Sequence, residues 1–450
     1  MNKFEKFLSK KVSIRVLILV VLLNLILAIQ LANLATKSKS VNDLVKVPQN
    51  LKKIILRSDK DLMVPDKFNK KQNFTIKDDH FFENYLLISR YDGDKKTPIV
   101  ELIDIQNKEV IHKWKPKINE IIELSKLDRK IFNLERDNNQ KRSIMRHPLL
   151  LKDGSLIFSG NQFPLTKIDV CSKIKWISDF PYHHSIEVDH EGNFWSTGTN
   201  YPQIVTNGVD EKIGVIENFF RDDSIIQVSN SGKVLFKKSV LQIFMENELD
   251  HLIFPGEVNT SYDPLHINDV QPVLKDGKYF KKGDIFLSLR NNSTILLYRP
   301  QNNKIIWLKK NPWVYQHDID IIDNERISIF DNKNLIFYPR YTDQELKPKY
   351  NDLLIFDFET QRVSNEYKNH FIKFDIRTPS QGLSSLYKGN VFVEETNSGR
   401  VIYFNKKGEL LFEYINRAEN GNVYTLGWSR LVNVEDNKET LKIINNSKCY

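Results

Sequence analysis

The chain has 450 residues, 40% of them hydrophobic and 11% aromatic, which is enough to bury a sizeable core. Its 66 Lys and Arg exceed 57 Asp and Glu by nine, and over this length such a surplus is weak support for nucleic-acid binding. The two cysteines have no metal-type spacing. We therefore expect a protein that does not bind nucleic acid.

The N-terminal region has the charge pattern of a membrane anchor. Residues 1–15 are basic, and residues 16–34 are apolar except for three amides, which is close to the length that crosses a bilayer. Positive charge on the N-terminal side predicts that this end is cytoplasmic and that the rest lies on the periplasmic or extracytoplasmic side. A cleaved signal peptide is the alternative, but cleavage after Ala35 would put Asn33 where a small residue is preferred. Residues 35–74 are predicted to be a polar tether.

One long helix is expected before the repeats begin. Apolar residues recur at helical spacing from Lys117 to Asp137, which predicts an inserted surface helix. The rest of the region lacks long helical patterns.

Five histidine-led or glutamine-led hairpins follow between residues 146 and 400. Each has a polar lead residue, an apolar-alternating strand, a turn about eight residues later and a second strand. The lead residues are His147, His184, His266, His317 and Gln381. Repetition of this kind indicates stacked or radial modules.

A second type of hairpin, two alternating strands joined by a polar turn, recurs six times, for example in TILLYRPQNNKIIWLKK. Paired with the first type, these hairpins predict four-stranded antiparallel blades. We therefore expect an all-β, six-bladed β-propeller over residues 75–440, preceded by one transmembrane helix and followed by a C-terminal tail at 441–450. The segment from Val423 is the candidate strand that closes the ring.

The two cysteines are expected to be unpaired. Cys171 lies within a repeat and Cys449 is next to the C-terminal residue, and a terminal tail is a poor disulfide partner. A pair between them remains the alternative.

The first strand of each propeller blade lines the central channel, so the lead residues should converge at one mouth. Three histidines can bind zinc, but no close pair spacing supports a metal site. Nucleophilic catalysis is the nearer hypothesis, because a neutral imidazole can attack while a neighbouring imidazolium donates a proton. A histidine copied by repetition to bond the neighbouring blade is the structural explanation.

These phrases, HHSIEVDHEGNFW, LHINDV with DIFLSLRNNSTI, YQHDIDI with SIFDN, and VFVEETNSGRVIYF, resemble the bacterial arylsulfotransferase family of six-bladed propellers. The resemblance covers about residues 85 to 435. It implies a sulfotransferase that moves a sulfuryl group from an aryl sulfate to a phenol or other hydroxyl acceptor. The implied route is ping-pong through a sulfated histidine, without a nucleotide sulfate donor or other cofactor.

The resemblance assigns roles to individual residues. His317 of the QHD phrase corresponds to the nucleophile, His266 and Asn268 to an HxN element, Arg290 to the arginine of the following strand, and His184 to the histidine of an earlier blade. Arg290, Asn268 and a protonated His266 are expected to meet the outer oxygens of the sulfuryl group.

Three further residues are expected to contact substrate at the same mouth, namely His147, His183 and Gln381. Two rival functions remain open. One is a membrane-anchored, non-catalytic propeller that binds a protein or glycan. The other is a quinone-cofactor dehydrogenase, which would need eight blades docked by tryptophans, whereas the six tryptophans here follow no repeat.

Overall fold

A computed structural model describes Leu23 and residues 62–69, 71–77, 80–128, 134–201, 203, 221–253, 263–333 and 350–449. The chain divides into two units, Met1–Asp61 and Leu62–Tyr450, and the fold given below is that of the second. The predicted tail at 1–15 and span at 16–34 lie outside the described residues, apart from Leu23. Within the described ranges, no helix is long and apolar enough to cross a membrane.

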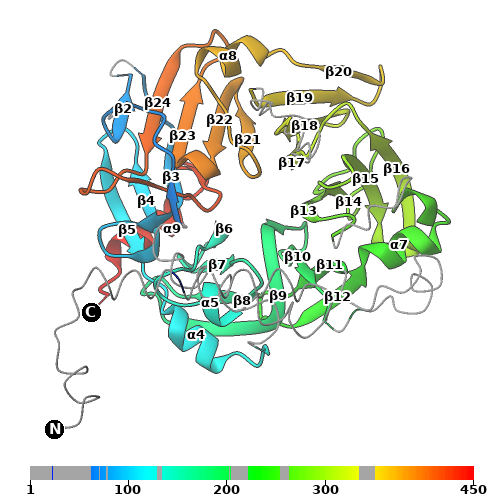
Figure 1. Cartoon of the computed structure of the whole chain (residues 1–450), viewed down its shortest axis with the longest axis horizontal. Coiled ribbons are helices and arrows are strands. Elements are labelled where there is room, and N and C mark those ends of the chain that lie inside the picture. The colour runs from blue at the N-terminus through cyan, green and yellow to red at the C-terminus, as the bar shows by residue number, and fades with distance from the viewer. Residues whose placement is uncertain are drawn as a thin grey trace, which may run out of the picture. The chain divides into compact units, whose positions relative to one another are not determined.

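Antiparallel sheets arranged around a common centre form this unit (Figure 1). Three of them have four strands each. The first contains β13 (Ile267–Pro272), β14 (Ile285–Leu289), β15 (Thr294–Arg299) and β16 (Lys304–Lys310). The second contains β17 (His317–Ile321), β18 (Arg326–Asp331), β19 (Asp352–Asp357) and β20 (Arg362–Ser364). The third contains β26 (Arg430–Asn433), β3 (Asn84–Asp92), β4 (Thr97–Asp104) and β5 (Glu109–Trp114).

The other two large sheets are wider. One has five strands in the order β2 (Phe74–Ile76), β24 (Leu410–Ile415), β23 (Arg400–Phe404), β22 (Asn390–Glu395) and β21 (Leu383–Tyr387). The other has seven, namely β6 (Arg146–Leu150), β7 (Leu156–Ser159), β8 (Phe163–Ile168), β9 (Ile174–Val188), β10 (Phe194–Thr199), β11 (Asp223–Val228) and β12 (Val234–Ser239).

The predicted all-β propeller-like fold of four-stranded antiparallel sheets is confirmed, but the count of six separate blades is wrong. Four sheets are separate blades, and the region expected to form two more is one seven-stranded sheet. The cause is β9, which runs for 15 residues without a break. Its first part pairs with β8 and its second part with β10, and Tyr182 is paired on both sides.

The core lies between neighbouring sheets rather than inside one of them. Phe286 and Ile295 of one sheet pack with Ile327 and Phe356 of the next, and similar clusters fill the other junctions. Strands in the middle of a sheet, such as β14, are therefore buried on both faces, which explains near-continuous apolar runs such as IFLSL.

The ring closes through strands from opposite ends of the unit, as predicted. Strand β26 pairs antiparallel with β3, and Arg430 lies opposite Leu87. A second closure joins β1 (Met63–Val64) to β25 (Val423–Tyr424), and β2 adds to the edge of β24. The packed region therefore begins near Leu62, so the predicted tether at 35–74 extends too far.

Short helices lie outside the sheets. They are α4 (Ile118–Leu124), α5 (Leu134–Asp137), α7 (Val240–Glu246), α8 (Lys368–Lys373), α9 (Lys438–Asn446) and the 3₁₀ helices η3 (Asp250–Leu252), η4 (Pro300–Asn302) and η5 (Thr396–Ser398). The single helix predicted from Lys117 to Asp137 is wrong, because Ser125 is extended and ends α4. The Ser125 hydroxyl donates to Asp179 at 2.6 Å and holds this break against β9.

The C-terminal residues are not a free tail, which corrects the boundary predicted at 441–450. Leu441 and Ile444 of α9 are buried in the cluster that joins the third sheet to the seven-stranded one. The Thr440 hydroxyl donates to the Lys152 carbonyl at 3.2 Å, so α9 is also tied to the β6–β7 turn.

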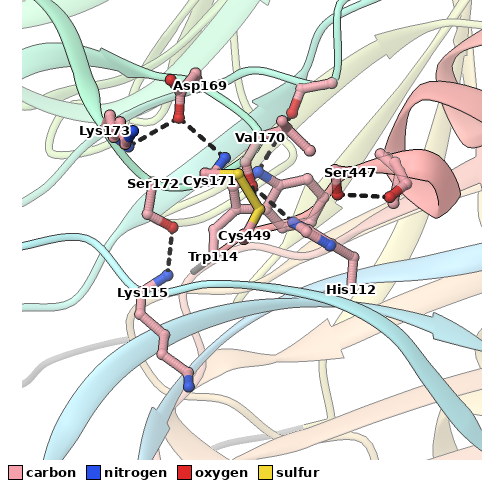
Figure 2. The surroundings of a disulfide bond; sticks show 12 residues. His112, Trp114, Lys115, Asp169, Val170, Cys171, Ser172, Lys173, Ser447 and Cys449 are labelled. Atoms are coloured by element: carbon pink, nitrogen blue, oxygen red, sulfur yellow. Dashed lines mark hydrogen bonds between the residues drawn. A yellow bond between two sulfur atoms is a disulfide. The ribbon is translucent and has the colours of Figure 1, made fainter.

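The expectation of two unpaired thiols is also wrong, because Cys171 and Cys449 form a disulfide (Figure 2). Docking of α9 brings Cys449 beside the β8–β9 turn, and the two Cα atoms are 5.1 Å apart. Native disulfides of this kind stabilise a fold by about 2 to 5 kcal/mol. This bond fixes the C-terminus onto a sheet far away in sequence.

Candidate active site

Inner strands are joined at the centre by side chains that accept hydrogen bonds from the backbone of the next inner strand, within the seven-stranded sheet for the first pair below and between neighbouring sheets for the others. The pairs are His147 Nδ1 with Ile186 N (3.3 Å), Ser185 Oγ with Val270 N (3.0 Å), Asp269 Oδ2 with Ile319 N (2.7 Å) and Asp318 Oδ2 with Ser384 N (2.8 Å). At the closure, Glu394 accepts from Trp428 N and Ser429 N. We call this set the inter-sheet ring.

The backbone is left-handed at the start of three inner strands and at one position inside β9. The φ angle is 44° at His147, 60° at His184, 50° at His266 and 50° at Asp318. Residues other than glycine seldom adopt this region, and the strand register shifts beside each of these positions. Such β-bulges change the direction in which side chains point, and here they let adjacent side chains contact different parts of the structure.

Imidazole rings from three sheets meet at the centre. The ring of His184 lies 4.9 Å from His183, 5.1 Å from His266 and 6.3 Å from His317, measured between ring centres. The structure thus brings these four predicted residues together, although they come from three different sheets. They form the candidate active site.

His317 has one nitrogen fixed and one free. Its Nδ1 lies 2.6 Å from Asn332 Oδ1, an acceptor, so Nδ1 carries the proton. Its Nε2 is buried and has no hydrogen-bond partner within the described residues. Burial lowers the pKa of His317 well below its usual value, and the nearby Arg290 lowers it further. A neutral imidazole whose Nε2 lone pair is not engaged in a hydrogen bond is the form that acts as a nucleophile.

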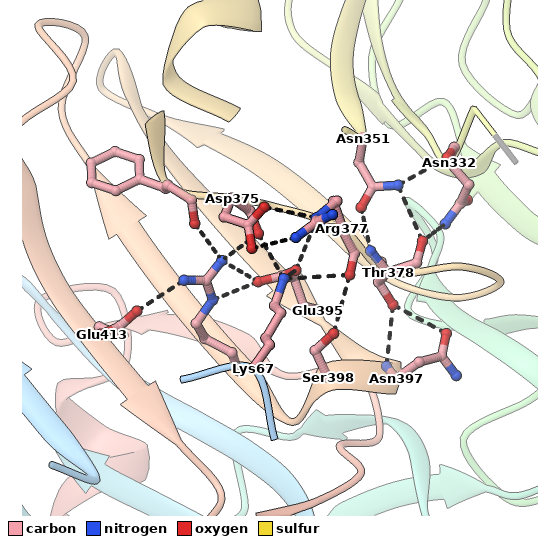
Figure 3. Close-up of polar contacts among 12 residues, drawn as sticks. Lys67, Asn332, Asn351, Asp375, Arg377, Thr378, Glu395, Asn397, Ser398 and Glu413 are labelled. Atoms are coloured by element: carbon pink, nitrogen blue, oxygen red, sulfur yellow. Dashed lines mark hydrogen bonds and ion pairs between the residues drawn. The ribbon is translucent and has the colours of Figure 1, made fainter. Parts of the chain in front are cut away.

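The orientation of Asn332 follows from its own hydrogen bonds (Figure 3). Its Nδ2 donates to the Thr378 carbonyl at 3.1 Å and to the Gln381 carbonyl at 3.3 Å, which leaves Oδ1 directed at His317. Asn351 donates to the backbone carbonyls of both Asn332 and Thr378, so the backbone of Asn332 is fixed as well as its side-chain amide. The tautomer of His317 is therefore set by the loops that flank it.

His266 is paired with a carboxylate. Its Nδ1 contacts Asp263 Oδ2, and Arg221 Nη1 lies 3.4 Å from the same oxygen. The carboxylate orients the imidazole, as a general acid and base requires. The side chain of His266 remains 17% exposed, so it can exchange protons with solvent.

His183 and His184 share a chain of hydrogen bonds. His183 Nε2 lies 3.2 Å from Asp223 Oδ1, and His183 Nδ1 lies 2.8 Å from His184 Nδ1. Burial lowers the pKa of His183 to about 4 and that of His184 well below its usual value. Burial alone would raise the pKa of Asp223, but Arg221 and His183 hold it below its usual range. The anion at this end is therefore the carboxylate, and both imidazoles are neutral.

Arg290 places a permanent cation beside the histidines. Its guanidinium stacks on the Tyr315 ring at 4.8 Å and donates from Nη1 to Asn291 at 2.8 Å. Its buried Nε has no hydrogen-bond partner within the described part of the chain. Burial lowers the pKa of Arg290, yet a guanidinium stays charged at neutral pH.

Asn268 does not face the histidines as a free donor, which corrects the role predicted for it. Its Nδ2 donates to the Gln316 carbonyl at 2.8 Å. The asparagine therefore fixes the peptide that leads into His317. It is a positioning residue.

The remaining two predicted residues have structural contacts. His147 belongs to the inter-sheet ring, and its backbone N–H also donates to the Gly427 carbonyl at 2.7 Å. Gln381 supplies its backbone carbonyl to Asn332, as given above, and its own Oε1 is buried without a partner within the described residues. Within the described residues, neither makes a ring contact or a hydrogen bond with the imidazoles of His184, His266 or His317.

The sequence analysis missed Trp428. Its ring centre lies 5.3 Å from that of His147 and 6.1 Å from those of His184 and His317. The φ angle of Trp428 is 71°, the same left-handed conformation as the lead histidines, so the LGWSR phrase is a further lead position with tryptophan in place of histidine. Trp428 is 1% exposed, and its ring provides an apolar surface beside the histidine rings.

A family model described as arylsulfotransferase (ASST) matches residues 147–417, which is more than half of the chain. The chain belongs to the arylsulfotransferase family. Membership supports sulfotransferase activity in general and implies small aryl sulfates and phenols as substrates. The match begins at His147 and includes every predicted site residue.

Among solved structures, this arylsulfotransferase-family chain is similar to a protein of unknown function from Bacteroides caccae (TM-score 0.45, 11% identity, 78% of this chain and 98% of that chain). It is also similar to a nidogen/laminin complex (0.40, 8%, 78% and 98%) and to a streptogramin B lyase (0.39, 10%, 80% and 98%). No curated protein matches it. These scores are too low to support an argument about function.

Within the described ranges of this arylsulfotransferase-family chain, no group of three His, Cys, Asp or Glu residues is placed to hold a metal ion. The His184 ring meets the rings of His183 and His266 edge-on, at 88° and 80°, and is tilted by 39° against that of His317. Their arrangement suits proton transfer and nucleophilic attack.

The buried His183 predicts a pH dependence of stability. Its folded pKa of about 4 lies below the unfolded value of about 6.5, so protonation favours unfolding. Its contribution is fully present above pH 6.5 and is lost as the pH falls to about 4, a change of about 3 kcal/mol. The substitution His183→Gln keeps an amide that can donate to Asp223 but cannot titrate. We expect the free energy of unfolding of this variant to fall less steeply with acidification.

Urea denaturation between pH 7.5 and pH 4 measures this difference, with His190→Gln as the control at a partly exposed histidine. The control should follow the wild type across the range. Parallel curves for the wild type and His183→Gln would contradict the neutral, buried state of His183.

Proposed function

We propose that the protein transfers a sulfuryl group from an aryl sulfate to a phenolic or other hydroxyl acceptor by a ping-pong route through sulfated His317, without a nucleotide sulfate donor. The observation that supports this most directly is the buried, unpartnered Nε2 of His317, with the proton held on Nδ1 by Asn332. Nucleophilic histidine needs this tautomer and this lack of competing hydrogen bonds.

In the first half-reaction, the lone pair of His317 Nε2 attacks sulfur, an N–S bond forms, and the S–O bond to the aryl group breaks. The departing phenoxide takes a proton from His266. In the second half-reaction, His266 takes the proton of the acceptor hydroxyl, the acceptor oxygen attacks sulfur, and the N–S bond breaks. His317 returns to its neutral form, so atoms and charges balance over the cycle.

Sulfuryl transfer resembles phosphoryl transfer in placing negative charge on three outer oxygens and on the leaving oxygen. The unpartnered Nε–H of Arg290 is the free charged donor beside His317, and its guanidinium is held flat by Tyr315. A preorganised donor of this kind stabilises a transition state by about 2.7 to 4 kcal/mol. We propose that Arg290 binds the sulfuryl oxygens.

The structural explanation for the repeated histidines applies to His147 alone. His147 bonds the next inner strand, β9, through its side chain, whereas Ser185, Asp269 and Asp318 do this at the junctions that follow. His184, His266 and His317 are thereby released from that task. This division favours an active site over a non-catalytic platform that binds a protein or glycan.

We also propose that residues 16–34 anchor the chain in a membrane and that the propeller lies on the extracytoplasmic side. The sequence pattern supports the anchor. The Cys171–Cys449 disulfide supports the compartment, because such bonds persist in oxidising environments.

The proposed location predicts the thiol state in cells. Acid-quenched cells should show Cys171 and Cys449 protected from a maleimide until a reductant is added, and the chain should stay in carbonate-washed membranes. A Cys171→Ser, Cys449→Ser variant controls for background labelling. Both thiols reacting before reduction would contradict the extracytoplasmic location.

Substitution of the nucleophile predicts loss of turnover. His317→Ala should lower kcat/KM for a chromogenic aryl sulfate by at least about 10⁴-fold, because it removes the nitrogen that carries the sulfuryl intermediate in the proposed route. With donor alone, the intact wild-type peptide that contains His317 should gain the mass of one SO₃ group, and phenol should remove it. His190→Ala is the matched control and should keep wild-type turnover.

A folded His317→Ala variant with undiminished turnover would contradict the proposal. A folded wild type that releases no phenol from any aryl or alkyl sulfate would favour the binding platform instead.

The role of His266 predicts a dependence on the leaving group. A phenol with a pKa of about 10 needs a general acid, whereas nitrophenoxide leaves without one. His266→Ala should lower turnover of phenyl sulfate by roughly 10² to 10⁴-fold and that of 4-nitrophenyl sulfate much less. Asp263→Asn should act in the same direction, because it removes the partner of His266 Nδ1. Equal losses with both donors would contradict general acid catalysis by His266.

A further inference from the structure

A second cavity lies further along the inner strands, away from the histidine rings. Its volume is about 360 Å³, and its lining includes Glu187, Asp318, Asp320, Ser328, Ser429 and Arg430. Asp320 is three residues beyond His317 on β17, and Glu187 is three residues beyond His184 on β9. At about 3.3 Å per strand residue, this places the polar lining about 10 Å from the imidazoles.

Carboxyl groups outnumber arginine and lysine side chains in the lining of this cavity. Arg430 is the guanidinium in its lining, and it is already bound to Glu187, with Nη2 3.1 Å from Oε1. Asp318 accepts a backbone hydrogen bond from Ser384 as part of the inter-sheet ring. For Asp320, the described residues provide no hydrogen-bond or ion-pair partner. An unpaired carboxylate in a buried setting is unfavourable unless a cation or a proton meets it.

A hydroxyl group gives an independent sign of a missing partner. Ser328 is 1% exposed, and its Oγ has no hydrogen-bond partner within the described residues. Ser328 lies directly opposite Asp320 in the β17–β18 ladder, so both side chains are on the same face. Buried hydroxyls normally have partners, so the cavity wall offers an unused hydrogen-bonding group beside the free carboxyl.

Part of the remaining lining is apolar and consists of Ile321, Ile322, Leu383, Leu386 and Leu431. No group of three acidic, histidine or cysteine residues in the described ranges is placed to hold a metal ion. A ligand for this cavity therefore combines a positive charge and hydrogen-bond donors at one end with a hydrocarbon body. We propose that the cavity binds a small organic ammonium compound, with its ammonium group on Asp320 and its apolar part against the leucines.

This binding should depend on pH. Burial raises the pKa of Asp320 to about 7, and Glu187 and Asp269 raise it while Arg430 lowers it. The other titratable groups that face the cavity are His147, Asp318 and Tyr387. Below pH 7 an alkylammonium must displace the proton of Asp320, so its affinity should fall by up to about tenfold per pH unit. Above that pH the affinity should level off, because the amine, like Lys, stays protonated to about pH 10.

Titration calorimetry on the full chain in detergent tests the proposal with benzylamine, and with benzyl alcohol as the uncharged analogue. We expect saturable 1:1 binding of benzylamine at pH 8, at least tenfold tighter than benzyl alcohol, with proton release when the titration is repeated at pH 6.5. Asp320→Asn should weaken benzylamine binding at least tenfold. Asp323→Asn, at the neighbouring exposed turn, is the matched control and should bind as the wild type.

Circular dichroism establishes whether Asp320→Asn is folded. If it is not, Ser328→Ala serves instead and should weaken benzylamine binding several-fold. Equal affinity for the amine and the alcohol, undiminished binding by folded Asp320→Asn, or no binding of benzylamine at all would each overturn the proposal. The histidine cluster takes no part in this site, so these results are independent of sulfuryl transfer.

Discussion

The structure depends on the hydrogen bonds of the inter-sheet ring. Sheets of a propeller pack through apolar side chains, which give cohesion but do not by themselves set the axial height of one inner strand against the next. The carboxylates of Asp269 and Asp318 do so by accepting a backbone N–H from the neighbouring sheet. Both are buried, so these bonds form without competition from water. A shift of one residue in any inner strand would leave an acceptor unpaired.

The ring also explains how functional histidines are placed. His184 directly precedes Ser185, and His317 directly precedes Asp318, so at two junctions one residue of a pair bonds the next sheet and the other faces the centre. The left-handed backbone at these bulges makes this division possible, because it turns adjacent side chains in different directions. Structural and chemical roles therefore lie next to each other in the sequence.

Burial then decides the chemistry available to each imidazole. His183, His184 and His317 all have lowered pKa values, and burial is the main cause in each. At His266, Asp263 contacts Nδ1 and the edge of the ring remains open to solvent. The same side chain, histidine, is thus a neutral nucleophile at one position and an acid or base paired with a carboxylate at another. The difference comes from the surroundings of each ring. Three residues beyond His317 on β17, Asp320 has no hydrogen-bond or ion-pair partner within the described residues. The cavity lining at that point favours a cation and not a sulfate.

Much of this arrangement could be predicted from the amino-acid sequence, because it follows from local periodicity. Alternating apolar residues specify strands, polar turns specify hairpins, and repetition of a lead histidine specifies positions that converge wherever such hairpins are arranged radially. On this basis the sequence determined the all-β propeller, the closing strand after Val423 and the meeting of His184, His266 and His317. It also carried the resemblance to the arylsulfotransferase family.

Tertiary structure alone decided the features that depend on contacts between distant segments. Cys449 reaches Cys171 only because α9 docks on the third sheet, and the amphipathic residues of that short helix did not reveal its partner. The continuous β9 joins two expected blades into one sheet. It does so because its first part pairs with β8 and its second part pairs with β10. Asn332, Asp263 and Trp428 carry no repeat signal, and their roles arise because loops from different sheets meet at the centre. Periodicity records which face of a strand is buried, whereas a hydrogen-bond partner is set by the three-dimensional position of another segment.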